Sequence, residues 1–94
     1  MQIEWDENKN RLNQKKHGVS FEVAREIFND PFQIAKLDHR FNYFEERWIT
    51  VGSTKDNVII VVANLFFSED GEEIIRIISA RNADKKERRS YEKC

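Results

Sequence analysis

The chain has 94 residues, 39% hydrophobic and 12% aromatic, a composition that supports the core of a single small domain over residues 1–94 and excludes wholesale disorder. Charged residues make up 35%, the formal net charge is −1, and no stretch approaches the roughly 20 apolar residues of a membrane-spanning helix. Residues 1–6 have neither the basic region nor the apolar core of a secretion signal, and a single cysteine, Cys94, excludes an internal disulfide; a cytoplasmic protein is therefore expected.

The first predicted elements are a short strand over residues 3–5 and a helix. Asp6 can cap this helix, which would run to about His17, and Gly18 follows where a helix is expected to stop. The chain then starts a second predicted helix at Ser20, which ends before Pro31 because proline cannot continue the hydrogen-bond ladder.

The first helix is unusually polar. Leu12 is its only aliphatic residue, so its predicted core stripe consists of Trp5, Leu12 and Val19. A helix that buries so little either is solvated or presents a binding face. Three of its polar residues fall on one side: Asn10, Asn13 and His17. Trp5 is expected in the core, together with Phe21 of the second helix.

After the proline the hydrophobic pattern becomes that of strands, predicted over residues 32–37, 47–51, 58–66 and 73–80. The short connections between them indicate an antiparallel meander. Asp84, followed three residues later by Glu87, is typical of the capping box of a final helix. The predicted fold class is α+β: an antiparallel sheet of about four strands with two N-terminal helices and one C-terminal helix against one face.

Positive charge is concentrated towards the C-terminus. Residues 76–94 carry seven Lys or Arg against three Asp or Glu, whereas residues 46–75 carry two against six. The last predicted strand contains Arg76 and runs into Arg81, and arginine offers a planar set of donors that suits phosphate. This distribution indicates nucleic acid at one face, although a solvated basic end would give the same pattern.

The sequence resembles BrnT-type toxins over almost its whole length. The first half of the resemblance is carried by Trp5-Asp6-Glu7-Asn8-Lys9-Asn10, Asn13, Lys16-His17-Gly18-Val19-Ser20-Phe21 and Phe28-Asn29-Asp30-Pro31. The second half is carried by Glu46-Arg47, Gly52, Arg76-Ile77-Ile78-Ser79-Ala80-Arg81, Glu87-Arg88 and Tyr91. These segments occur in order and with natural spacing, and Asp84 stands where a small hydroxylated residue is expected.

This resemblance implies a ribonuclease toxin of a bacterial type II toxin–antitoxin pair, with a RelE-like fold. It also implies a cognate BrnA-type antitoxin, a ribbon-helix-helix DNA-binding protein that neutralises the toxin and represses the shared operon. Operator DNA would then be contacted only through the antitoxin, and a toxin homodimer within the complex is compatible with this arrangement. We expect the antitoxin to cover the cationic face.

Metal-independent RNA cleavage requires a base for the ribose 2′-OH, cations for the charge on the phosphate and an acid for the leaving 5′-oxygen. Arg76, Arg81 and Arg47 are the candidates for phosphate stabilisation. In a regular strand, Arg76 and Arg81 point to opposite faces because they are five positions apart. Both reach one site only if a bulge or the strand end redirects Arg81.

The candidates for general acid or base are His17, Glu46, Lys9, Lys16 and Tyr91. Histidine is the residue type best suited to proton transfer near neutral pH, but His17 can equally bond the last carbonyls of its helix. Glu46 can act as a base or form a plain surface ion pair. Tyr91 can contact RNA or pack the last helix against the domain.

The residues predicted to bind RNA are Lys9, Lys16, Lys85, Arg88 and Tyr91. Trp48 or Tyr43 can stack on bases, although packing in a core or an interface accounts for them better. Neither a metal nor another cofactor is expected, because His17 and His39 are far apart and lie in no spacing typical of a zinc site.

Three functions fit these observations. The resemblance favours an endoribonuclease toxin. The alternatives are a non-catalytic nucleic-acid-binding module that uses the cations of residues 76–93 and the first helix, and a protein-interaction domain whose basic end pairs with an acidic partner.

Overall fold

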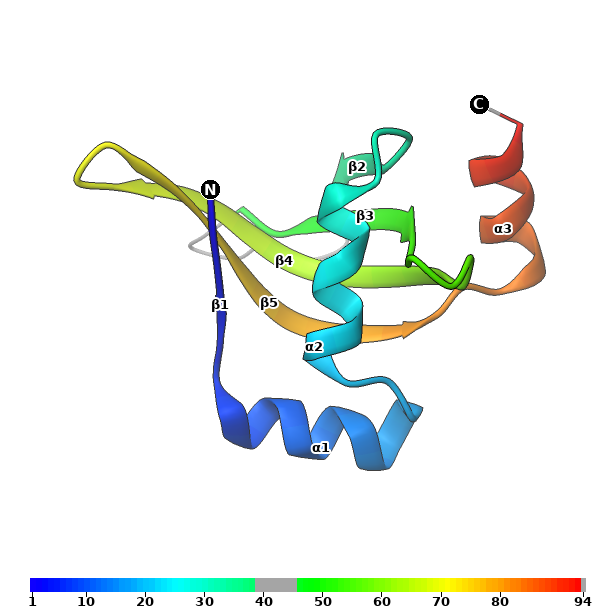
Figure 1. The fold of residues 1–94 in the computed structure, drawn as a ribbon, viewed down its shortest axis with the longest axis horizontal. Coiled ribbons are helices and arrows are strands. Elements are labelled where there is room, and N and C mark those ends of the chain that lie inside the picture. The colour runs from blue at the N-terminus through cyan, green and yellow to red at the C-terminus, as the bar shows by residue number, and fades with distance from the viewer. Residues whose placement is uncertain (39–45, 94) are drawn as a thin grey trace.

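Five strands form one mixed sheet in the computed structural model, which describes residues 1–38 and 46–93 (Figure 1). The strands are β1 (Gln2–Trp5), β2 (Ile34–Leu37), β3 (Trp48–Ser53), β4 (Ile59–Glu69) and β5 (Glu72–Asn82), in the order β1-β5-β4-β3-β2. Strands β2 to β5 form the predicted antiparallel meander, and β1 adds to β5 in parallel. The prediction of a sheet of about four antiparallel strands is therefore wrong in one respect, because the sheet also contains the parallel strand β1. Local periodicity can indicate a strand, but it does not show that this strand pairs with another about 70 residues later in the chain.

The helices are α1 (Glu7–His17), α2 (Phe21–Ala24), the 3₁₀ helix η1 (Arg25–Asn29) and α3 (Lys85–Glu92). The predicted caps are confirmed: Asp6 accepts from two backbone N–H groups of α1, and Gly18 has the left-handed φ of 71°. The second predicted helix is α-helical only to Ala24 and tightens to a 3₁₀ helix before Pro31, as the last turn of a helix often does. Among the described residues, no helix is long and apolar enough to cross a membrane.

One core lies between the sheet and α2 with η1. Its buried cluster consists of Val19, Phe21, Ala24, Ile27, Ile60, Val62, Ile77 and Ala80. Phe21 lies in this cluster and Trp5 packs against it, as predicted, and the two rings meet edge to face with centres 6.1 Å apart. Gly52 of β3 lies directly under η1, where an added Cβ would come within 2.8 Å of the Ile27 Cβ. The helical layer therefore sits very close to the sheet.

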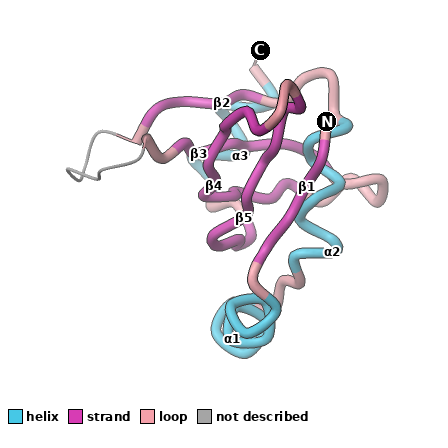
Figure 2. Tube along the Cα trace, turned by 90° about the vertical axis from the view of Figure 1, so that its left-hand side faces the viewer, coloured by secondary structure: helices cyan, strands magenta, loops and turns pink. Residues whose placement is uncertain are grey.

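Helix α1 is attached to the sheet by asparagines instead of aliphatic residues. Leu12 is 65% exposed, so the predicted stripe of Trp5, Leu12 and Val19 is wrong at its centre. Asn13 is buried; its side chain donates to the carbonyls of Val19 and Ala80, each at 2.8 Å, and accepts from the Ala80 N–H at 3.1 Å. Because β1 pairs only with residues 74–77 of β5, the Asn13 carboxamide takes the place of a strand neighbour at Ala80. Figure 2 shows α1 end-on beside the sheet.

Helix α3 lies at the end of the sheet where β5 ends and β4 begins (Figure 1). The predicted capping box is present, with Asp84 and Glu87 each accepting from the other's backbone N–H. At the other end of the helix the Tyr91 hydroxyl donates to Asp30, which also accepts from the N–H of Ser53 at 2.8 Å. Tyr91 thus connects α3 to the segments that follow η1 and β3.

Candidate active site

A bulge in β5 places Arg76 and Arg81 on the same face of the sheet. Ile77 pairs with Asn64 and Ser79 with Ala63, so Ile78 has no residue opposite it. Arg76 consequently faces Leu65 and Arg81 faces Val61, which are four positions apart on β4 and share one side of the strand. Because of this bulge, the two arginines share one face although they are five positions apart in the sequence, a spacing that would put them on opposite faces of a regular strand.

The arginines lie on the face of the sheet that points away from α2 and η1. Ile77 follows Arg76 and Ala80 precedes Arg81, and both of these apolar side chains enter the core on the other face. Four residues of β4 correspond to about 13 Å along the strand. Arg76 and Arg81 are thus suited to two different phosphates of one RNA strand lying along β5, and less suited to one phosphate together.

Arg76 is oriented by a carboxylate of β1. Its Nε donates to Glu4 Oε2 at 2.6 Å, its Nη2 is 2.5 Å from the same oxygen, and its guanidinium lies 5.4 Å from the centre of the Phe67 ring. The Arg76 side chain is 51% exposed, and an ion pair this open contributes only about 0–1 kcal/mol. The Nη1 hydrogens therefore remain available, and a phosphate can compete with Glu4 for the others.

Arg81 is held by α3. Its two terminal nitrogens donate to the two carboxylate oxygens of Glu87, each at 2.7 Å, and one of them also donates to the Asn82 carbonyl at 3.3 Å. The hydrogen bond with Glu87 raises the pKa of Arg81, and the same bond lowers the pKa of Glu87 against the opposing effect of burial. Both groups stay charged near neutrality, which leaves the Nε donor of Arg81 for a further anion.

Glu46 and Arg76 share one cavity. A hollow of about 450 Å³ is lined by Glu46, Leu65, Phe66, Phe67 and Arg76. Glu46 lies just before β3 and is exposed, so its carboxylate can exchange protons with solvent. This hollow combines a carboxylate, a guanidinium and an aromatic wall.

The remaining acid–base candidates lie elsewhere. His17 ends α1, about 16 Å along the helix axis from its start near β1. Gln14, three residues before His17, and Gly18, directly after it, line a cavity with Asn82, so this end of α1 lies towards the end of β5 and away from Glu4. Lys9 and Lys16 are exposed on α1.

Arg47 is half-buried directly before β3, and its carbonyl accepts from the Asp38 N–H at 2.7 Å. Trp48 packs edge to face on Phe66 with ring centres 5.5 Å apart, which fits the packing role. His39, Tyr43 and Cys94 lie outside the described residues.

Two residues that shape the site were absent from the sequence-based candidates. No motif or spacing in the sequence indicates a role for Glu4, since only the parallel pairing of β1 with β5 brings it opposite Arg76. Glu87 was assigned to the capping box, and its second role towards Arg81 depends on where α3 lies. Within residues 1–38 and 46–93, no group of His, Cys, Asp or Glu has the arrangement to hold a metal ion.

A family model described as "Ribonuclease toxin, BrnT, of type II toxin-antitoxin system" matches residues 5–87. The chain belongs to the BrnT family. The resemblance stated from the sequence is therefore confirmed, and membership of a type II toxin–antitoxin family implies an antitoxin partner.

The BrnT fold is also seen in a solved relative. The crystal structure of the Brucella abortus ribonuclease toxin, BrnT, is 29% identical in sequence, with a TM-score of 0.59 over 90% of this chain and 99% of that one. No curated protein sequence matches the chain. The family match spans Glu46, Arg76, Arg81 and Glu87 and stops before Arg88 and Tyr91.

Proposed function

We propose that this BrnT-family chain is a cytoplasmic endoribonuclease toxin. It cleaves RNA without a metal ion, by attack of a ribose 2′-OH on the adjacent phosphorus. The observation that carries this proposal is the cavity shared by Glu46 and Arg76, because it joins a base and a phosphate-binding cation in one hollow.

In this mechanism Glu46 takes the proton of the 2′-OH as the new bond from the 2′-oxygen to phosphorus forms. Arg76 donates to the non-bridging oxygens, where negative charge accumulates in the transition state. The bond to the 5′-oxygen then breaks, and solvent in the open cavity supplies its proton. The products are a 2′,3′-cyclic phosphate and a 5′-hydroxyl.

Arg81 binds a phosphate further along the same strand, and Glu87 keeps its guanidinium in place. Arg47 adds positive charge beside Glu46 in the sequence. Lys9 and Lys16 on α1 contribute long-range attraction to RNA. His17 is the residue to test as the base if Glu46 proves dispensable.

A cognate BrnA-type antitoxin neutralises the toxin by covering the face that carries Arg76 and Arg81. Cancelling these charges removes both RNA affinity and transition-state stabilisation. Operator DNA is then reached through the antitoxin alone.

The test is RNA cleavage by purified, antitoxin-free protein in EDTA. Arg76→Ala and Glu46→Gln are each expected to slow cleavage by about 10²–10³-fold, the usual cost of removing one such group. Lys15→Ala on α1 removes an exposed cation that does not line the cavity and should have a much smaller effect on cleavage.

Intact RNA at high excess of the wild-type protein would contradict the proposal. Salt-sensitive RNA binding without cleavage would instead support the non-catalytic nucleic-acid-binding module. Absence of both would support the protein-interaction domain.

A further inference from the structure

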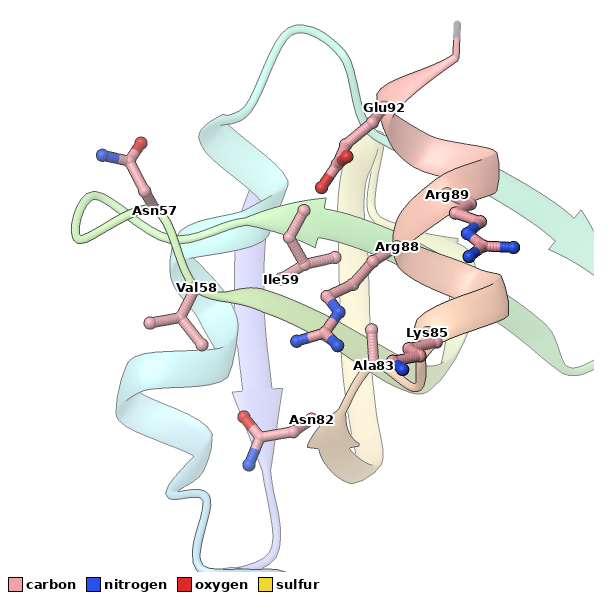
Figure 3. Close-up of a pocket in the computed structure, with 9 residues that line it drawn as sticks. All are labelled: Asn57, Val58, Ile59, Asn82, Ala83, Lys85, Arg88, Arg89 and Glu92. Atoms are coloured by element: carbon pink, nitrogen blue, oxygen red, sulfur yellow. The ribbon is translucent and has the colours of Figure 1, made fainter.

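A second, larger cavity lies between α3 and the start of β4. It encloses about 650 Å³ and is lined by Asn57, Val58, Ile59, Asn82, Ala83, Lys85, Arg88, Arg89 and Glu92 (Figure 3). It is separate from the hollow that holds Glu46 and Arg76, because the two share no lining residue.

The polar side chains of this cavity are not engaged with one another. In the part of the chain that the structure describes, no hydrogen bond or ion pair engages the side chains of Lys85, Arg88, Asn57 or Asn82. Figure 3 shows Arg88 reaching from α3 towards Val58 and Asn82, with Lys85 beside Ala83. Lys85, Arg88 and the two carboxamides thus offer unused donors and acceptors to a space that Arg89 and Glu92 also line.

The backbone that presents these groups is rigid. Asn57 closes a tight turn with a φ of 64°, its N–H donates to the Thr54 carbonyl at 3.0 Å, and Thr54 accepts from Val58 through its hydroxyl. Asn82 ends β5 opposite Ile60. The backbone of both asparagines is therefore held in place before a ligand arrives, while their exposed carboxamides remain free to rotate towards it.

The chemistry of the lining matches a nucleotide. Val58 is 44% exposed, and with Ile59 and Ala83 it offers an apolar surface for a base. Lysine and arginine suit a phosphate. A carboxamide places one donor and one acceptor side by side, and on the Hoogsteen edge adenine is the base that pairs with it in two hydrogen bonds, through N6–H and N7.

We propose that this cavity binds one unpaired nucleotide of the RNA and reads its base. Lys85 and Arg88 hold the phosphate, while Asn82, assisted by Asn57, pairs with the Hoogsteen edge of an adenine. The proposal rests on the proposed function for its substrate. Asn82 directly follows Arg81, so their Cα atoms are about 3.8 Å apart. Because neighbouring residues of a strand point to opposite faces, an RNA strand with one phosphate on Arg81 bends around the end of β5 to place a neighbouring nucleotide in the cavity.

The experiment measures binding apart from cleavage. Short 2′-O-methyl oligonucleotides of A, C, G or U, which lack the attacking hydroxyl, are titrated at several salt concentrations and followed by fluorescence anisotropy. The wild type is expected to favour the adenine oligomer by about 5- to 100-fold, the range of one base-reading carboxamide pair. Asn82→Ala should remove this preference and leave the other three affinities within about two-fold.

The cation variants use a matched pair on one helix. Lys85→Gln should weaken the binding of all four oligomers alike. It should also lower the slope of the logarithm of the binding constant against the logarithm of the salt concentration by about one. Lys86→Gln removes the same charge from the next residue, which is exposed but outside the cavity, and should have a smaller effect. Asn57→Gly keeps the positive φ accessible and should reduce the adenine preference partially.

An unchanged base preference in Asn82→Ala, or equal losses in the two lysine variants, would overturn the proposal. If RNA is bound with an adenine preference but is never cut, the proposed ribonuclease function is wrong and the nucleotide-binding cavity is supported. If RNA is cut while all cavity variants bind it like the wild type, the ribonuclease function is supported and the nucleotide-binding cavity is wrong. Circular dichroism of each variant confirms that the fold is retained.

Discussion

At the scale of single residues, polar side chains carry out tasks that apolar side chains usually perform. Asn13 attaches α1 to β5, although a helix is normally attached by an apolar stripe. Its carboxamide satisfies backbone groups of Val19 and Ala80 that would otherwise be buried without partners. The mean composition of α1 therefore says little about its importance for stability.

Replacing Asn13 by leucine should lower the free energy of unfolding by about 2–4 kcal/mol, since three buried backbone bonds are lost. Leu12→Ala, at the neighbouring exposed position, should change it by less than about 0.5 kcal/mol. Urea denaturation of the two variants makes the comparison. A reversed order of stability would refute the attachment through Asn13.

At the scale of elements, the docking of α3 through Tyr91 and Asp30 depends on pH. Burial acts to raise the pKa of Asp30, but hydrogen bonds from Tyr91, Ser53 and Phe32 outweigh it and lower that pKa below 3.8. The hydrogen bond to Asp30 raises the pKa of Tyr91 to about 12. Both shifts favour the folded state when Asp30 is ionised and Tyr91 is protonated.

Tyr91→Phe should therefore destabilise the protein by about 1–2 kcal/mol at neutral pH, through loss of a hydrogen bond to a charged group. The difference from the wild type should shrink as the pH falls below about 4 and Asp30 takes up a proton, because a depressed folded pKa stabilises only above the unfolded value. It should shrink again above pH 10 as unfolded Tyr91 ionises, and disappear as the pH passes about 12.

Urea denaturation of both proteins across this pH range measures the difference. A difference that stays constant with pH would mean that the Tyr91–Asp30 bond does not hold α3 in solution.

The elements that follow from local chemistry were predictable, and those that depend on distant partners were not. Asp6, Gly18, Ser20 and Asp84 cap their helices as the sequence predicts, since a cap needs only its own turn. The bulge at Ile78 could not be located from one strand, because a bulge is a relation between two strands. The same limit applies to the candidate site: Arg76 was identified, but its contact with Glu4 was not.

At the scale of the whole molecule, the sheet separates two tasks. One face packs on α2 and η1 to form the core, and the other carries Arg76 and Arg81. The cavity under α3 adds further cations at the end of this sheet. A near-neutral chain can thereby attract a polyanion, because the position of its charges matters more than their sum.

If the antitoxin covers this face, Arg76→Glu should weaken its binding at least ten-fold, since an opposite charge would meet the acidic groups of the partner. Lys15→Glu makes the same charge change on α1 and should leave the affinity nearly unchanged. Calorimetric titration of each toxin variant with the antitoxin gives both values. Equal affinities for the two variants would place the antitoxin on another surface.

The central claim, cleavage by the 2′-OH of the substrate with Glu46 and Arg76 at the reacting phosphate, is tested most directly by the ends of the products. One RNA is incubated with the wild-type protein in EDTA, beside the same RNA carrying a single 2′-deoxy nucleotide at the cut position. The account predicts a 2′,3′-cyclic phosphate and a 5′-hydroxyl from the first RNA and no cut at that position in the second. Cleavage of the 2′-deoxy substrate at the same position, or products with a 5′-phosphate, would contradict it.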